Sequence, residues 1–258
     1  MNRFMRVLVA AIMLCPLLLV PAIVEAQQQE PPVYTFVSLW DVPRAQWADF
    51  TAYRDKNSRP VVERMFKDGT LASWGYFETV VHIENGYTHG GWYSATSIAG
   101  IERIRTELVK LPPNPAAAGA RHRDHLFRSL IYRTKGAGPT SGYLSVSATQ
   151  VQPGKGEEWR ELWDKYAKPT LEELLANGTV THFELEVEDV HTENPGWRYS
   201  VEIAPSAEGV DKVNVAFRAL GDKRSAEERR AVGAAFREVT VPGAHWDYVA
   251  RVTNYAQK

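Results

Sequence analysis

The chain has 258 residues and a formal net charge of −1. This near-neutral balance gives no reason to expect nucleic acid or an acidic membrane surface as a partner. Its only cysteine is Cys15, so an internal disulfide framework and a cysteine-based zinc site are both excluded.

Residues 1–26 have the pattern of a secretory signal peptide. Two arginines precede an apolar run over 7–20, and modest-sized residues offer cleavage after Ala26. We therefore expect a periplasmic or secreted protein whose mature part lacks Cys15. The alternative is an uncleaved membrane anchor, because the apolar run approaches the length of a membrane span. Two prolines, one within the apolar run and one directly after it, favour cleavage. No later stretch is long and apolar enough to cross a bilayer, so no membrane partner is expected once the signal peptide is removed.

The remainder of the chain contains an internal repeat, which appears when Pro60 is aligned with Pro169. In this alignment, residues 59–85 and 168–194 are identical at eight of 27 positions, where ordinary residue usage gives about two by chance. In the first copy the shared residues are Pro60, Glu63, Gly69, Thr70, Val81, His82, Glu84 and Asn85. A repeat of domain size favours a duplicated domain over a solenoid.

Each copy predicts the element order β-α-β-β-α-β. In the first copy, an amphipathic helix from about Trp47 is broken or kinked at Pro60 and stops at Gly69. The strands and second helix around it are expected at 34–40, 71–82, 91–95, 98–111 and 125–133. The second copy repeats this order at 143–151, 159–178, 180–191, 197–203, 207–219 and 245–254, with an additional charged helix at 225–239.

These elements divide the chain into a signal peptide, a disordered lead-in, two repeats and a linker. The expected boundaries are 1–26, 27–33, 34–134 for the first repeat, 135–141 for the linker and 142–258 for the second repeat. The element order, the proline-interrupted first helix and the tandem copy resemble the dimeric α+β barrel superfamily, in particular its NIPSNAP and antibiotic-biosynthesis-monooxygenase types. The resemblance implies an α+β fold in which two ferredoxin-like repeats pack as a pseudo-dimeric barrel. The superfamily includes cofactor-free oxygenases, haem-handling enzymes and proteins without known activity, so the resemblance implies one of these classes. No catalytic residue of the superfamily can be matched to a residue of this chain.

Histidines are the candidate catalytic residues. His82 and His191 occupy equivalent positions in two His-x-Glu-Asn segments, which are either related acid/base half-sites or a turn that was copied with the repeat. His125 and His245 each open a predicted closing strand and are candidate pocket residues. His122 and His125 would share one face of a helix, but no third ligand is identifiable, so no metal site is predicted.

Tryptophans are the candidate ligand-binding residues. Trp92 and Trp197 both follow a glycine and are expected to be equivalent, while Trp74 and Trp246 lie on or near strands. Such residues line a pocket for a flat or apolar ligand, or they fill the core of a fold with two sheets.

The sequence contains no nucleophile elbow, phosphate-binding loop, dinucleotide fingerprint or zinc-protease motif. The leading hypothesis is an exported protein that binds a small molecule within or between the repeats, without a cofactor. The first alternative is a cofactor-free or haem-dependent oxidoreductase or monooxygenase that uses a histidine. The second alternative is a structural or interaction module without a ligand.

Overall fold

The computed structural model describes residues 32–81, 86–136, 140–191 and 195–258. The expected signal peptide, His82 and the Glu-Asn part of both His-x-Glu-Asn segments lie outside these residues. Within the described part of the chain, no helix is long and apolar enough to cross a membrane.

Both repeats have the predicted element order. The first consists of β1 (Tyr34–Asp41), α1 (Trp47–Tyr53), α2 (Arg59–Lys67), β2 (Ser73–Thr79), β3 (His89–Ala95), α3 (Ile98–Val109) and β4 (Arg121–Thr134). The second consists of β5 (Gly142–Val151), α4 (Gly156–Tyr166), α5 (Lys168–Ala176), β6 (His182–Glu188), β7 (Trp197–Ala204), α6 (Ala207–Asp222), α7 (Ala226–Val239) and β8 (Thr240–Gln257).

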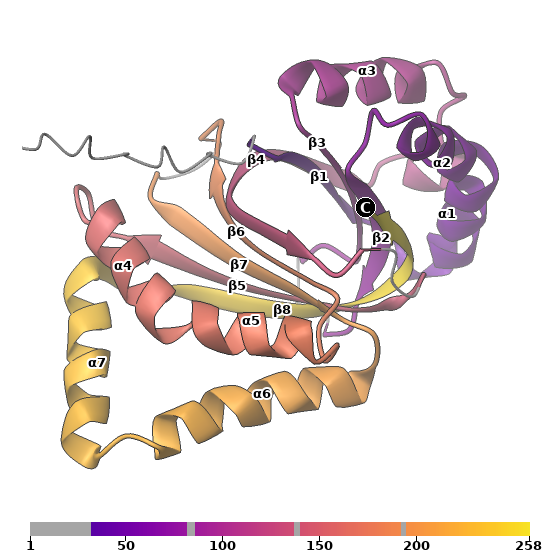
Figure 1. Ribbon diagram of the computed structural model, residues 1–258. Helices are drawn as coiled ribbons and strands as arrows, with labels where there is room; N and C mark the ends of the chain where they lie inside the picture. Colours follow the sequence, from indigo (N-terminus) through magenta and orange to yellow (C-terminus); the bar gives the residue numbers. More distant parts are fainter. Residues whose placement is uncertain (1–31, 82–85, 137–139, 192–194) are drawn as a thin grey trace, which may run out of the picture. The chain divides into compact units, whose positions relative to one another are not determined.

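The described strands form one closed antiparallel barrel in the order β1-β3-β2-β8-β5-β7-β6-β4. Each repeat contributes a four-stranded sheet with the ferredoxin-like order, β4-β1-β3-β2 and β8-β5-β7-β6. The two sheets join where β2 pairs with β8 and where β4 pairs with β6. Helices α1 to α3 lie beside the first sheet and α4 to α7 beside the second (Figure 1). The predicted α+β fold of two tandem ferredoxin-like repeats in a pseudo-dimeric barrel is confirmed.

The helix before Gly69 is not broken at Pro60. A π-helical turn, Arg54–Ser58, connects α1 directly to α2, and the Arg59 N–H reaches back to the carbonyl of Arg54. This wider turn accommodates a proline, which lacks an N–H group and crowds the carbonyl four residues before it. In the second repeat the interruption falls at Ala167, between α4 and α5.

Strand register relates the repeats residue by residue. Val37 pairs with Trp92 between β1 and β3, and Val146 pairs with Val201 between β5 and β7. These pairs keep the alignment of Pro60 with Pro169, so Trp92 corresponds to Val201. The expected equivalence of Trp92 with Trp197 is therefore wrong, because the shared Gly-Trp dipeptide falls at different strand positions.

The closing strands also align differently from the prediction. His122 pairs with Trp40 and His245 pairs with Thr149, so the counterpart of His245 is His122. His125 is not the first residue of its strand, because β4 already begins at Arg121. On a strand, residues three apart point to opposite faces, so His122 and His125 do not face one ligand.

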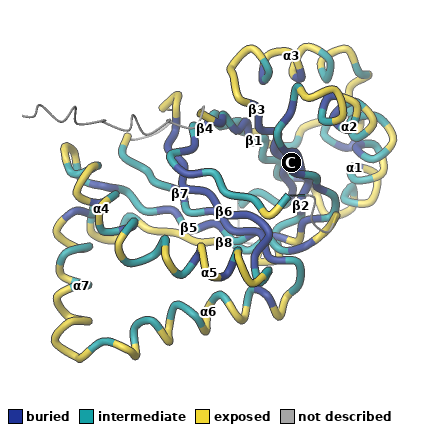
Figure 2. Tube along the Cα trace, viewed as in Figure 1, coloured by how far each residue is buried: buried dark blue, intermediate teal, exposed yellow. Residues whose placement is uncertain are grey.

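The barrel interior is largely apolar, with a small buried group of hydroxyl side chains, Thr35, Ser73 and Ser94, that bond one another. Its main cluster includes Phe77, Trp92, Phe127, Leu144, Val146, Val201 and Val252. The inner face of β6 adds three buried carboxyl groups, those of Glu184, Glu186 and Glu188. Outside the barrel, separate clusters pack the helices of each repeat against its sheet. Buried positions accordingly follow the strands, while the outward sides of α6 and α7 are exposed (Figure 2).

Candidate functional site

The outer face of the first repeat is closed by two tryptophans. Trp47 meets His89 edge-on at a ring-centroid distance of 5.1 Å, and Trp40 stacks on His122 at 3.9 Å. Phe50 packs between them, 6.0 Å from Trp40 and 5.0 Å from His89. Trp40, Trp47 and Phe50 belong to one hydrophobic cluster under α1.

The second repeat has small residues at both tryptophan positions. In the alignment of the two copies, Trp40 corresponds to Thr149 and Trp47 corresponds to Gly156. Trp47 contacts His89 in the first repeat, and the corresponding residues Gly156 and Arg198 are also neighbours in the second. A Cβ atom on Gly156 would lie 3.0 Å from Nη2 of Arg198. The indole that covers His89 in the first repeat thus has no counterpart over Arg198.

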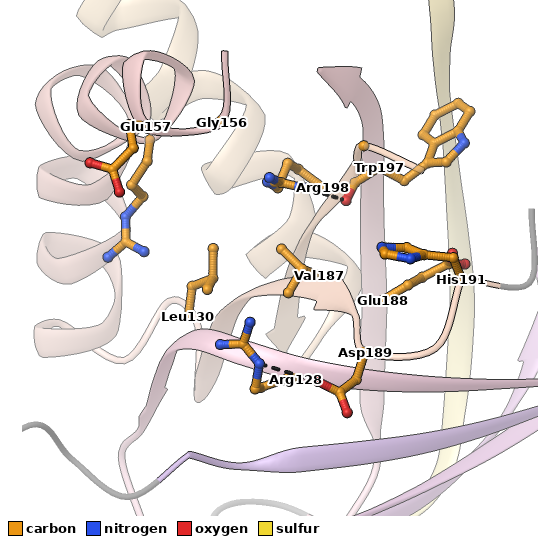
Figure 3. A pocket seen from close by; sticks show the side chains of 12 residues that line it. Arg128, Leu130, Gly156, Glu157, Val187, Glu188, Asp189, His191, Trp197 and Arg198 are labelled. Carbon is orange, nitrogen blue, oxygen red and sulfur yellow. Dashed lines mark hydrogen bonds and ion pairs between the residues drawn. The ribbon is translucent and has the colours of Figure 1, made fainter. Parts of the chain in front are cut away.

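Two clefts lie against α4 where these side chains are small. The first, which we call the seam cleft, has a volume of about 530 Å³ and lies where β4 of the first repeat meets β6 of the second. Its walls are Arg128 and Leu130 of β4, Val187 and Glu188 of β6, Arg198 of β7 and the first turn of α4 (Figure 3).

The second cleft, which we call the α4–α7 cleft, has a volume of about 540 Å³. Its walls include Trp159 and Trp163 of α4, Phe236 and Arg237 of α7, and Thr149 and His245 on adjacent strands. Trp159 and Trp163 are buried core residues, and each also contributes to a wall of this cleft. A cleft of this size, with aromatic walls and a few polar groups, is typical of a small-molecule site.

Arg198 lines both clefts. Its side chain is half-buried, and Nη1 donates a hydrogen bond to the Trp197 carbonyl at 3.0 Å. Burial, and then the neighbouring cation of Arg128, lower the pKa of Arg198. Arg128 is paired with Asp189 at 3.3 Å, whereas Arg198 forms no ion pair with any acidic residue that the structure describes.

A buried hydrogen-bonded group lies at the inner wall of the seam cleft. Glu188 Oε1 accepts a hydrogen bond from the Tyr199 hydroxyl at 3.1 Å and lies 3.1 Å from His125 Nδ1. The second carboxylate oxygen, Oε2, is buried without a hydrogen-bond partner among the described residues. Figure 3 labels Glu188, His191 and Trp197 among the residues that line the cleft.

The predicted site residues are distributed over these features. His191 and Trp197 line the seam cleft, and His245 lines the α4–α7 cleft. His125 lines neither cleft but contacts Glu188, a residue of the seam cleft. The other three described candidates lie elsewhere: Trp92 in the barrel interior, Trp74 under the helices of the first repeat, and Trp246 on β8 with 41% of its surface exposed.

The sequence prediction missed Arg128, Thr149, Gly156 and Arg198. No motif marks these residues, and the usable signal is a difference between the copies. In the pairs Trp40/Thr149 and Trp47/Gly156, one repeat has a large aromatic residue and the other has a small residue at the equivalent position. Such a difference indicates where the second repeat has an open space.

The two candidate histidines that line the clefts, His191 and His245, do not fit an axial haem ligand. Such a ligand needs a free imidazole nitrogen that faces an apolar cavity. His245 has both ring nitrogens engaged, Nδ1 at 3.0 Å from Thr149 Oγ1 and Nε2 at 3.0 Å from Asp247 Oδ2. His191 lies at an exposed wall of a cleft that also carries charged arginine and carboxylate groups. Among the residues in the described ranges, no three His, Cys, Asp or Glu side chains are grouped to hold a metal ion.

No protein-family model and no curated protein sequence matches the chain. Solved structures do match. A "putative monooxygenase" from Lactobacillus acidophilus has a TM-score of 0.61 and 9% identity, over 88% of this chain and 97% of its own. An "anthrone oxidase-like protein" has a TM-score of 0.51 and 13% identity, over 88% and 93%. A "putative chlorite dismutase" has a TM-score of 0.50 and 11% identity, over 86% and 95%.

These similarities define the class of fold, the dimeric α+β barrel built here from two repeats in one chain. At such identities they define the fold alone, because this fold carries unrelated activities.

Proposed function

We propose that the protein binds a small molecule in the clefts beside α4 of the second repeat. The observation that carries this proposal is the replacement of Trp40 and Trp47 by Thr149 and Gly156 at equivalent positions. The first repeat uses the two indoles to stabilise its helices, whereas the second leaves about 530 and 540 Å³ beside Arg198. Because an open cleft forgoes the stability that two packed indoles supply, its presence favours a ligand-binding role.

Filling the cleft tests the proposal. We expect protein purified under native conditions to carry a bound small molecule, detectable by native mass spectrometry, and Thr149→Trp to lose it. The new indole would occupy the α4–α7 cleft, as Trp40 occupies the corresponding space in the first repeat. The matched control is Gly221→Trp on α6, where an added side chain meets nothing within 4 Å. Equal ligand occupancy in Thr149→Trp and the wild type would contradict the proposal.

A second candidate function is acid–base catalysis on the bound molecule without a cofactor. The favouring observation is Glu188, whose one oxygen is held by His125 and Tyr199 while the other has no described partner. Oxidation of a quinol by O₂ would begin with removal of a hydroxyl proton, which Glu188 would accept from a molecule that reaches the barrel side of β6 behind the seam cleft.

This candidate predicts oxygen consumption with a quinol substrate that depends on Glu188. The change Glu188→Gln should lower the rate by a factor on the order of 10² to 10⁴, because the amide cannot accept the proton. The control is Glu157→Gln, an exposed acid on the same cleft. If the wild type consumes no oxygen with quinols, or both variants retain its rate, this second function is wrong.

A further inference from the structure

We infer that the α4–α7 cleft selects planar aromatic molecules that carry one carboxylate, with the carboxylate bound by Arg198. This inference rests on the proposed function and names the class of ligand. It is carried by the charge of the cleft, by the shape of its walls and by the absence of a described counter-ion.

The charge of the cleft is one-sided. None of its described lining residues is acidic, whereas Arg198 and Arg237 both line it. Neither arginine forms an ion pair with a residue in the described ranges. Of the two, Arg198 is the half-buried one. A partly desolvated guanidinium without a counter-ion is destabilising, and a bidentate carboxylate is the ligand that best fits its planar donors.

Two carboxyl groups on the strands of the second repeat, Asp247 and Glu202, are engaged by other side chains. Asp247 Oδ2 lies 3.0 Å from Nε2 of His245. Glu202 lies on β7, where its Oε1 accepts a hydrogen bond from the Ser200 hydroxyl at 2.8 Å. Neither group lines the α4–α7 cleft. Arg198 also forms no ion pair with Glu157, Glu188 or Asp189, the described acidic residues of the seam cleft that it lines as well.

The walls of the cleft suit a flat ring. Trp159 and Trp163 are one helical turn apart and therefore lie on the same face of α4. Phe236 adds a third aromatic wall from α7. Aromatic side chains bind flat apolar rings through dispersion and offset stacking. Since Arg198 and these rings line the same cleft, a ligand with a ring and one anionic group can contact both at once.

The test is isothermal titration of the full chain with three probes: 2-naphthoate, its neutral counterpart 2-naphthamide, and acetate. We expect 2-naphthoate to bind at least tenfold more tightly than 2-naphthamide, and acetate to bind weakest. Arg198→Met should reduce 2-naphthoate affinity to the level of 2-naphthamide. The matched control is Arg64→Met, because Arg64 lies on α2 of the first repeat, lines neither cleft and pairs with Glu107 at 2.9 Å. Arg198→Lys provides a second variant if Arg198→Met does not fold, and it should retain the preference for the anion.

The outcomes separate this inference from the proposed function. If naphthoate and naphthamide bind equally and Thr149→Trp abolishes both, the cleft is a binding site but the inferred carboxylate selectivity is wrong. If neither probe binds the wild type, the inferred ligand class is wrong, whereas the proposed function still depends on the native ligand and its loss in Thr149→Trp. If Arg198→Met and Arg64→Met weaken naphthoate binding equally, Arg198 is not the carboxylate-binding residue.

Discussion

At the scale of single residues, Arg198 depends on Gly156 for its exposure to a ligand. His89, at the corresponding position of the first repeat, is fully buried beneath Trp47 and Phe50. A side chain at position 156 would meet the end of the Arg198 side chain, which is flexible enough to move aside. His89 is therefore covered by the Trp47 indole, whereas Gly156 provides no side chain to cover Arg198.

Glu202 gives a prediction about pH and stability. Burial raises the pKa of its carboxyl group from 4.5 to about 7. Since the folded state holds the proton more tightly than the unfolded state, stability falls as pH rises from 4.5 to 7. Glu202→Gln should remove this loss and raise the free energy of unfolding at pH 8 by about 3 kcal/mol.

Denaturant unfolding at pH 4.5 and pH 8 measures this effect, with Glu161→Gln as the exposed control on α4. Burial and the nearby Glu184 also raise the pKa of Glu186, which contributes in the same direction. The difference between wild type and Glu202→Gln therefore isolates Glu202. An equal pH dependence in both proteins would contradict the assignment.

The buried glutamates of β6 could not be predicted from the sequence. Residues His182 to Glu188 alternate polar and apolar side chains, a pattern typical of a strand with one face in water. In the closed barrel the polar face points inward, and Glu184, Glu186 and Glu188 are all buried. Ser129, for example, donates a hydrogen bond to Glu184 at 2.9 Å. Closure of the barrel, which depends on both repeats, decides the environment of these residues.

At the scale of elements, α7 is the helix that distinguishes the second repeat. It begins with a capping box in which Ser225 and Glu228 bond each other's backbone N–H groups. Phe236 and Arg237, near its other end, form one side of the α4–α7 cleft. The charged helix expected at 225–239 is thus present as Ala226–Val239, but its role as a cleft wall follows only from its packing against α4.

Ser225→Ala should lower the free energy of unfolding by about 1 kcal/mol, because the first turn of α7 loses its cap. It should also weaken binding in the α4–α7 cleft, since a frayed α7 holds Phe236 less firmly. Ser97→Ala is the matched control, because Ser97 caps α3 in the first repeat by accepting a hydrogen bond from Gly100 N at 3.1 Å. Thermal unfolding and 2-naphthoate titration should show similar destabilisation in both variants and weaker binding only in Ser225→Ala. Weaker binding in both would contradict a specific role for α7.

At the scale of the whole molecule, the two repeats share one barrel. The seams β2–β8 and β4–β6 are both continuous ladders between the repeats, so separating them would expose four strand edges. We therefore expect one cooperative unfolding transition. Near-ultraviolet circular dichroism and amide hydrogen exchange should report the same midpoint for both repeats, whereas two separate transitions would contradict a shared core.

The fold was predictable at this scale because the repeat is visible in the sequence. Prolines, glycines and strand patterns that match between the two copies specified two α+β units. The site was less predictable, because the prediction relied on residues that the copies share. The clefts arise instead where the copies differ, and Trp40/Thr149 and Trp47/Gly156 gain meaning only once both members of each pair are known to occupy equivalent places in the fold.

Exchanging these residues between the repeats tests the account most directly. Native mass spectrometry would compare ligand occupancy in the wild type, in Thr149→Trp/Gly156→Trp and in Trp40→Thr/Trp47→Gly. The account predicts that the first double variant loses the ligand, while the second keeps it at the wild-type level despite a less stable first repeat. Retention of the ligand in the first variant, or its loss only in the second, would contradict a binding site in the second repeat.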